Sequence, residues 1–87
     1  MSIRFLNASR SYDATRRSVC FWGHDATFEI TFSVEEDALR LISPQSNRGE
    51  AGFLQAFDAN RSRIETAASK AYGRSRQSFY RLSGADF

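Results

Sequence analysis

The side chains best suited to chemistry gather in one short segment, SVCFWGHDATFEITF, residues 18–32. Cys20, His24 and Asp25 could form a nucleophile with its base and an orienting acid, or the first ligands of a metal ion. On an extended strand, Cys20 and His24 point to the same side but lie about 13 Å apart, at ~3.3 Å per residue. This separation is too long for one metal ion or for a hydrogen-bonded catalytic pair, unless the turn folds His24 back. We therefore expect no metal site and no catalytic site here.

No other segment supplies a known catalytic pattern. The sequence contains no glycine-rich phosphate loop, no nucleophile elbow and no paired-carboxylate site. We expect a protein that needs no cofactor and acts without catalysis. A small enzyme of unknown type is the third of three hypotheses, behind the two binding functions given below.

Length and composition indicate one domain, residues 1–87. A chain of this length has room for one hydrophobic core, and the modest size of that core leaves oligomerisation open. Cys20 is the only cysteine, so no disulfide forms within the chain, which fits a reducing cytosol. No apolar run approaches the roughly 20 residues of a membrane helix, and the N-terminus does not resemble a signal peptide. We expect a cytoplasmic protein without membrane contact.

Four strands are predicted from apolar or alternating segments, with a polar connection over 7–17. The GHDA segment, 23–26, is expected to join the second and third strands as a hairpin. In the third strand, apolar side chains alternate with polar ones, which is typical of a strand with one buried face. The predicted strands are 3–6, 18–22, 26–34 and 77–82, and the alternating apolar residues of the third are Phe28, Ile30, Phe32 and Val34.

A short helix is predicted directly after the third strand. Ser33 with Glu36 three residues later forms a capping box, in which the two residues satisfy amides of the first helical turn. Pro44 is expected to end this helix, because proline removes a backbone donor and clashes with the preceding turn. Asn47 with Glu50 repeats the start signal before the next helix.

A long helix over about 50–72 is the clearest element of the sequence. Its apolar side chains recur at three- and four-residue steps and form one stripe. Gly73 is expected to be its left-handed C-terminal cap. The order β-β-β-α-α-β then predicts an α+β domain, with helices packed on one face of a mostly antiparallel sheet. The stripe consists of Phe53, Phe57, Ile64, Ala67, Ala68 and Ala71, with Leu54 and Tyr72 at its margin.

Two segments, FLNASRSYDATRRSVCFWGHDATFEITFSVEEDAL and FLQAFDANRSRIETAASKAY, carry a family resemblance over nearly the whole chain. They resemble the bacterial family known as domain of unknown function 1488. The shared features are an N-terminal Phe, a V-x-F-x-G strand that enters a turn, a strand that ends at a Ser-capped helix, and F-x-x-N-R-x-x-I in the second helix. The resemblance implies a small bacterial α+β protein and assigns no catalytic residues. The matching residues are Val19, Phe21, Gly23, Ser33, Phe57, Asn60, Arg61 and Ile64.

The register of the predicted hairpin decides which way Trp22 faces. With a two-residue turn at 24–25, Phe21 pairs with Phe28 on the core face and Trp22 faces away from the core. A three-residue turn at 23–25 turns Trp22 inward, because a slip of one residue exchanges the two faces of a strand. We favour the first register, since both strands then keep their apolar side chains together.

In the favoured register, the sheet face away from the helices is a candidate interaction surface. Aromatic side chains on such a face can mark a protein interface or a stacking platform for single-stranded nucleic acid. The alternative is that residues 3–6 or Tyr12 half-cover Trp22. The predicted surface consists of Cys20, Trp22, Thr27, Glu29, Thr31 and Phe79.

Charge is segregated along the chain. The net charge of +2 combines +3 over 1–24, −5 over 25–60 and +4 over 61–87. The acidic middle could pair with the basic ends, within the fold or across a dimer, or a basic surface could attract phosphates. Arg61 lies inside the apolar stripe, and we expect it to snorkel and pair with Glu65 or the first helix; holding an anion or a partner carboxylate is the alternative. The predicted basic patch consists of Arg61, Arg63, Lys70, Arg74 and Arg76.

These features favour a non-catalytic interaction or assembly module, with a second copy of the chain or another protein as its partner. We expect a homodimer. The alternative is a nucleic-acid-binding module that uses the basic patch together with the sheet-face aromatics.

Overall fold

The computed structural model describes residues 3–6, 9–44 and 49–87 and shows an α+β fold. Its strands and helices follow in the order β-β-β-α-α-α-β, so one predicted helix is present as two. The elements are β1 (Arg10–Asp13), β2 (Ser18–Asp25), β3 (Phe28–Glu35), α1 (Glu36–Ile42), α2 (Glu50–Ala59), α3 (Arg61–Arg74), β4 (Phe79–Leu82) and a final 3₁₀ helix, η1 (Gly84–Asp86).

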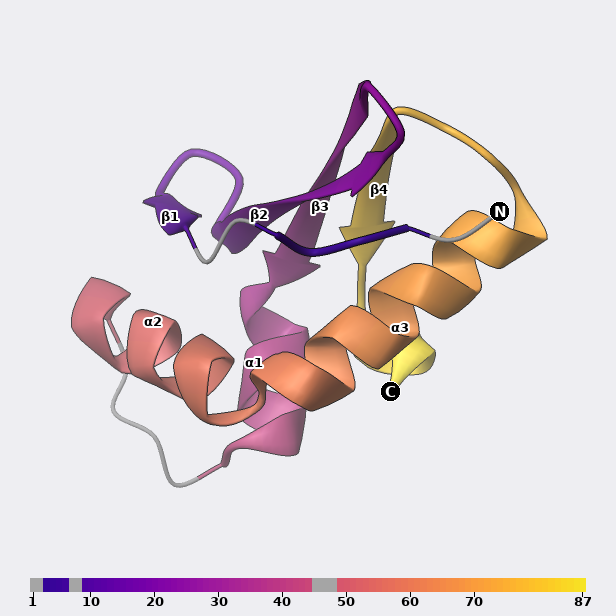
Figure 1. Cartoon of the computed structure of the whole chain (residues 1–87). Coiled ribbons are helices and arrows are strands. Elements are labelled where there is room, and N and C mark those ends of the chain that lie inside the picture. Colours follow the sequence, from indigo (N-terminus) through magenta and orange to yellow (C-terminus); the bar gives the residue numbers. More distant parts are fainter. Residues whose placement is uncertain (1–2, 7–8, 45–48) are drawn as a thin grey trace.

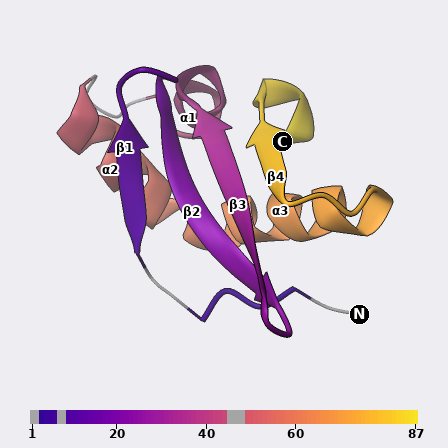
Figure 2. The same cartoon turned by 90° about the horizontal axis from the view of Figure 1, so that it is seen from above.

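The four strands form one mixed sheet in the order β1-β2-β3-β4 (Figures 1 and 2). β1, β2 and β3 pair antiparallel, whereas β4 pairs parallel to β3. A parallel neighbour needs a crossover connection, and α1, α2 and α3 form this crossover between β3 and β4. The prediction of a mostly antiparallel sheet is confirmed.

The helices cover one face of the sheet and leave the other face open (Figures 1 and 2). Between the two layers the core is rich in aromatic rings. The ring centroid of Phe21 lies 5.2 Å from that of Phe32 and 5.1 Å from that of Phe57 on α2, and Phe32 lies 5.2 Å from Tyr80 on β4. These rings therefore join the sheet to the helix layer. We call the helix-covered side the inner face and the opposite side the outer face.

The hairpin register differs from the predicted one, although the faces are as predicted. The turn is Ala26–Thr27, and Phe21 pairs with Phe32 instead of Phe28. In this register Phe32 and Val34 lie opposite apolar residues of β2. In the predicted register they would have no partner on β2, because they would lie opposite residues that precede this strand. The shift is an even number of residues, so the inner and outer sets do not exchange. Phe28 lies at the hairpin end, 73% exposed, and not in the core as predicted.

The N-terminal region also differs from the prediction. Residues 3–6 form no strand; Arg4 makes a single antiparallel bridge to His24, with two backbone hydrogen bonds of 2.8 Å. The first strand lies instead within the predicted connection 7–17, as β1. The physical reason is the length of β2, which extends to Asp25 and offers its edge to both segments.

Gly23, which is part of the V-x-F-x-G pattern, lies where the N-terminal segment packs on the sheet. A Cβ atom at this position would lie 2.7 Å from Cδ1 of Ile3 and 2.9 Å from Cε1 of Phe5. Both side chains pack against the core. A larger residue here would therefore force Ile3 or Phe5 to shift.

We expect Gly23→Ala to lower the free energy of unfolding by about 1–3 kcal/mol, the usual cost of overpacking. Denaturant unfolding measures this change. Gly73→Ala is the matched control, because Gly73 lies within α3 and a Cβ atom there would have no neighbouring side chain within 4 Å. This control should be stabilised by up to about 1 kcal/mol. Equal effects of the two substitutions would contradict the packing argument.

The predicted long helix is interrupted at Asn60, between α2 and α3 (Figure 1). Asn60 adopts φ −118° and ψ 21°, and its side-chain amide donates to the carbonyl of Ala56 at 2.9 Å. This local bond competes with the helical pattern, as is typical of asparagine. The whole predicted apolar stripe is nevertheless buried, apart from the half-buried Leu54. Gly73 is not the C-terminal cap, because α3 continues to Arg74 and its C-cap is Ser75.

The predicted capping box at the start of α1 is not formed. The N-cap is Glu35, which makes no side-chain cap hydrogen bond. Ser33 belongs to β3 and is buried, where its hydroxyl donates to the hydroxyl of Ser18 on β2 at 2.6 Å. Burial explains the difference, because an unpaired hydroxyl inside the protein is costly. α1 ends before Pro44, as predicted, whereas Asn47 lies outside the described residues.

A double-mutant cycle on Ser18 and Ser33 tests this pairing. We expect each single Ser→Ala variant to be destabilised by about 1 kcal/mol, and the pair to show a coupling energy of roughly 0.5–1.5 kcal/mol in denaturant unfolding. If Ser33 capped α1 instead, its effect would be additive with that of Ser18→Ala.

Candidate interaction surface

An aromatic row runs across the outer face from β2 to β4. Trp22 on β2 pairs with Thr31 on β3, and Thr31 pairs with Phe79 on β4, so the three side chains lie side by side on adjacent strands. All three are half-buried. Tyr80 and Leu82 of β4 are buried on the inner side, so Phe79 between them in the alternation lies on the outer face.

Polar and charged side chains border the aromatic row on both sides. One neighbouring row contains Cys20, Ser33 and Arg81 on β2, β3 and β4. On the other side His24 pairs with Glu29, and their Nε2 and Oε2 atoms are 3.7 Å apart. The outer face therefore has an aromatic centre between rows that carry charges of both signs.

The β1–β2 turn reaches part of this face. Asp13 accepts hydrogen bonds from the amides of Thr15 and Arg16, at 3.0 and 3.2 Å, and so folds the turn tightly. The Arg16 guanidinium lies over the ring of Phe79, 4.9 Å from its centroid. Sequence reasoning missed Arg16, because its position depends on how this turn folds back toward β4.

Five of the six predicted surface residues lie on the outer face. Thr27 is the exception, because the observed register places it in the hairpin turn. Of the residues considered as cover for Trp22, Phe5 and Tyr12 lie elsewhere. Phe5 packs on Phe21 and Phe32, and the Tyr12 ring stacks on Phe53 at 6.1 Å, so both side chains lie on the helix side of the sheet.

The residues of the possible nucleophilic site do not come together. Cys20 and His24 lie in rows on either side of the aromatic row, and Asp25 faces the helices, where it accepts a hydrogen bond from the Tyr72 hydroxyl. Within the described ranges, no group of three or more His, Cys, Asp or Glu side chains could hold a metal ion.

None of the helices that the structure describes is long and apolar enough to cross a membrane.

His24 carries the one buried side-chain nitrogen or oxygen atom that lacks a hydrogen-bond partner among the described residues, Nδ1. A cavity of about 320 Å³ adjoins it, lined also by Arg4, Leu6, Asp25 and Ala26. Asp25 and Glu29 place negative charge near this cavity, and Arg4 supplies one positive charge. The cavity therefore shows no clear preference for an anion or a cation.

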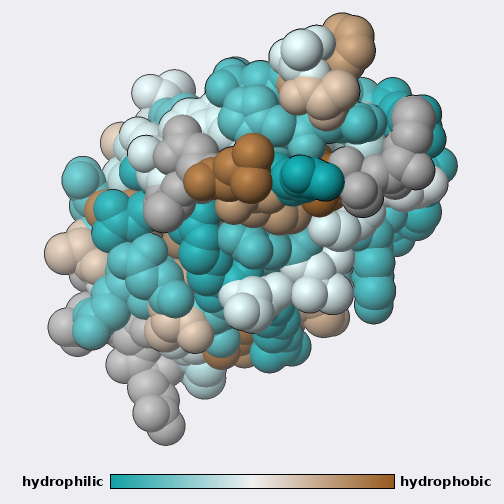
Figure 3. Space-filling view, in the orientation of Figure 1, coloured by the Kyte–Doolittle hydropathy of each residue, from teal (hydrophilic) through white to brown (hydrophobic). Residues whose placement is uncertain are grey.

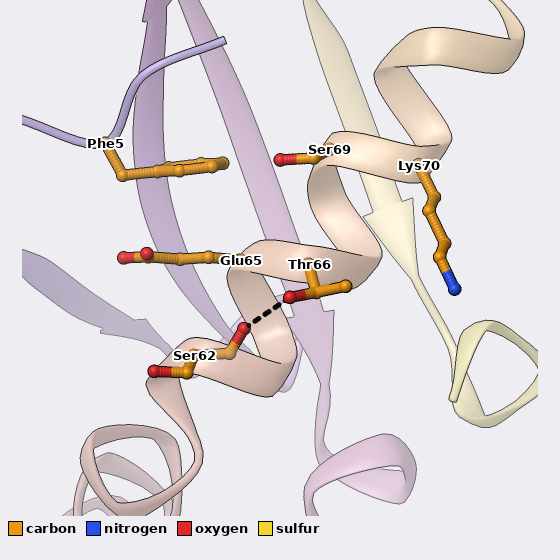
Figure 4. A pocket seen from close by; sticks show the side chains of 6 residues that line it. All are labelled: Phe5, Ser62, Glu65, Thr66, Ser69 and Lys70. Carbon is orange, nitrogen blue, oxygen red and sulfur yellow. Dashed lines mark hydrogen bonds between the residues drawn. The ribbon is translucent and has the colours of Figure 1, made fainter. Parts of the chain in front are cut away.

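A groove of about 580 Å³ lies between the N-terminal segment and α3 (Figure 4). The hydroxyl of Thr66 is occupied by a 2.9 Å hydrogen bond to the Ser62 carbonyl, and Glu65 pairs with Arg61 at 2.9 Å. Two of the polar side chains that line the groove are thus already bound within α3. Figure 3 shows this side of the molecule as mainly hydrophilic, with a small hydrophobic area near its centre.

Arg61 pairs with Glu65, as predicted, and its guanidinium lies 5.1 Å from the centroid of the Phe57 ring. Of the other predicted basic residues, Arg63 and Lys70 are exposed on α3. Nη2 of Arg74 lies 3.4 Å from Oδ1 of Asp86. α3 packs against the inner face of the sheet. The part of the basic patch on α3 and the aromatic row therefore lie on different sides of the sheet.

Two tyrosine–carboxylate hydrogen bonds connect the sheet to the helices. Tyr72 on α3 donates to Asp25 on β2, and Tyr12 on β1 donates to Glu36 on α1. Each hydrogen bond raises the pKa of its phenol above the ordinary value, and burial and the carboxylate charge act in the same direction. The folded protein therefore favours the protonated form of both phenols.

Because folding raises both pKa values, we expect the two hydrogen bonds to stabilise the fold fully below the ordinary tyrosine pKa of about 10. The free energy of unfolding should then fall as the pH rises above this value. Urea unfolding at several pH values between neutral and strongly alkaline measures this loss. The double variant Tyr12→Phe/Tyr72→Phe should lose less stability over the alkaline range than the wild type. An unchanged pH dependence in this variant would contradict the assignment.

Comparison with known proteins adds a family and a structural relative. The family described as "Protein of unknown function (DUF1488)" matches residues 3–83. The structure is similar to the 1.60 Å crystal structure of a protein of unknown function from the DUF1488 family, from Shewanella loihica PV-4. The chains are 18% identical, the match covers 93% of this chain and 91% of that chain, and the TM-score is 0.82. None of the curated proteins matches.

Proposed function

The chain belongs to the DUF1488 family, as its sequence resemblance predicted. We propose that it acts without catalysis, as an interaction module that assembles into a homodimer through the outer face of its sheet. The aromatic row carries this proposal. Trp22 and Phe79 lie on either side of Thr31 on the outer sheet face, which none of the described helices covers.

The composition of the outer face is that of an interface centre with a polar border. Tryptophan and arginine are enriched among the residues that dominate binding energy, and such residues lie near the centre of an interface. Trp22 is central, and Arg16 already stacks on Phe79 beside it. Two sheets that pack face to face at about 10 Å would bury this row from both sides.

The distribution of charge favours a second copy as the partner. In a two-fold dimer the same surface meets itself, so a surface of one sign would repel its copy. The outer face instead carries both signs of charge: its acids include Glu29 and Glu35 on β3, and its bases include Arg16 and Arg81. A surface with both signs can pair its acids with the bases of the second copy.

Nucleic-acid stacking is the second candidate function, and the exposed parts of Trp22 and Phe79 support it. Open sheets with aromatic side chains stack single-stranded bases in several RNA-binding folds. Glu29 and Glu35 on the same face oppose it, because they repel phosphates. Binding that falls steeply with salt would favour this function over the dimer.

Light scattering over a wide concentration range tests the homodimer. We expect Trp22→Ser and Phe79→Ser each to weaken dimerisation by at least about 30-fold, which corresponds to a contribution of about 2 kcal/mol from an interface centre. Leu41→Ser is the matched control, because Leu41 is a 59% exposed apolar residue on α1. Circular dichroism confirms that each variant is folded. A wild type that is monomeric throughout, or equal effects at Trp22 and Leu41, would overturn the proposal.

A further inference from the structure

β4 lies at one edge of the sheet and leaves backbone groups unpaired. The Thr31 amide on β3 donates to the carbonyl of Ser78 at 3.0 Å, just before β4 begins. Alternation along the strand then directs the amides and carbonyls of even-numbered residues toward β3. The N–H and C=O groups of Phe79 and Arg81 face out of the sheet, and no described residue binds them. We call these four groups and the side chains beside them the β4 edge.

Positive charge is concentrated at this edge. Arg74 and Arg76 precede β4, Arg81 lies on it and is exposed, and residues 74–82 contain no acid. Asp86 is the nearest acid in the sequence, and it already lies beside Arg74 and accepts a hydrogen bond from the amide of Ser83 at 2.8 Å. The β4 edge is therefore a basic edge.

The opposite edge of the sheet differs in charge. On β1, Arg10 pairs with Asp58 at 2.8 Å, and Asp13 adds a negative charge at the other end of the strand. α2 also contacts β1 and covers part of its surroundings. An excess of positive charge thus distinguishes the β4 edge from the β1 edge.

The helix layer extends beyond the β4 edge. Figure 2 shows α3 continuing past β4 on the side away from β3. A further strand at this edge would therefore lie over a helix and not in open solvent. A cavity of about 290 Å³ between α3 and the last residues of the chain lies on this side, and it is lined by Arg63, Lys70 and Asp86.

We propose that the β4 edge binds an extended acidic segment of another protein by strand addition. The backbone of the segment pairs with the outward groups of Phe79 and Arg81, and its acidic side chains face the arginines around β4. Main-chain bonds supply affinity in this mode of recognition, and side chains supply specificity. A second copy of the chain is disfavoured here, because two β4 strands would bring the same arginines of both copies together.

A blocked peptide of alternating Glu and Thr serves as the probe, with a Lys–Thr peptide and a backbone N-methylated Glu–Thr peptide as controls. Fluorescence anisotropy should show binding of the acidic peptide, and binding of the two controls should be at least about tenfold weaker. Arg81→Pro removes one outward N–H without changing the ladder to β3, and should weaken binding by about five- to tenfold. Arg81→Gln should weaken it by about two- to fivefold.

Arg4→Gln is the matched control, because Arg4 is exposed and lies beside β2, away from β4. This variant should bind the acidic peptide as the wild type does. Hydrogen exchange should show new protection of the Phe79 and Arg81 amides in the complex, and it needs no variant. No binding of the acidic peptide, equal binding of the N-methylated peptide, or unprotected amides at these two positions would each overturn strand addition.

Discussion

The register between β2 and β3 is the constraint on which the remaining structure depends. Phe21 lies opposite Phe32, and the two rings, both fully buried, contact Phe57 on α2 and Tyr80 on β4. A slip of one residue would expose these rings and turn Trp22 into the core. The loss of such large buried side chains from a domain of this size would remove much of its stability. The buried face of the hairpin thus determines which side chains the other face presents.

The crossover from β3 to β4 extends the same pattern to the last strand. Because Tyr80 and Leu82 fill the inner face, Phe79 and Arg81 lie on the outer side, and their backbone groups face the free edge. The aromatic row and the β4 edge therefore have one structural origin. They suit different partners. We propose that the aromatic row contacts the mixed-charge outer face of a second copy, and that the β4 edge pairs with the backbone of an extended acidic segment.

Local ion pairs explain why the ends of the chain remain basic. The sequence suggested that the acidic middle pairs with the basic ends, and Arg10 with Asp58 is such a pair. Several other pairs form within one turn of a helix, as between Arg61 and Glu65. Arg40 likewise pairs with acids of its own helix. Pairs of this kind are short-range, so they leave the segregation of charge along the sequence in place.

Much of the fold followed from the sequence, because alternation and helical periodicity record which side of an element is buried. The α+β class, the buried stripe on α2 and α3, and the faces of Trp22 and Phe79 could all be predicted in this way. Tertiary structure decided the rest. The hairpin register, the break at Asn60, the pairing of Ser33 with Ser18 and the position of Arg16 depend on contacts between segments distant in sequence. Local propensity contains no information about such contacts, and packing of the core selects among the locally acceptable alternatives.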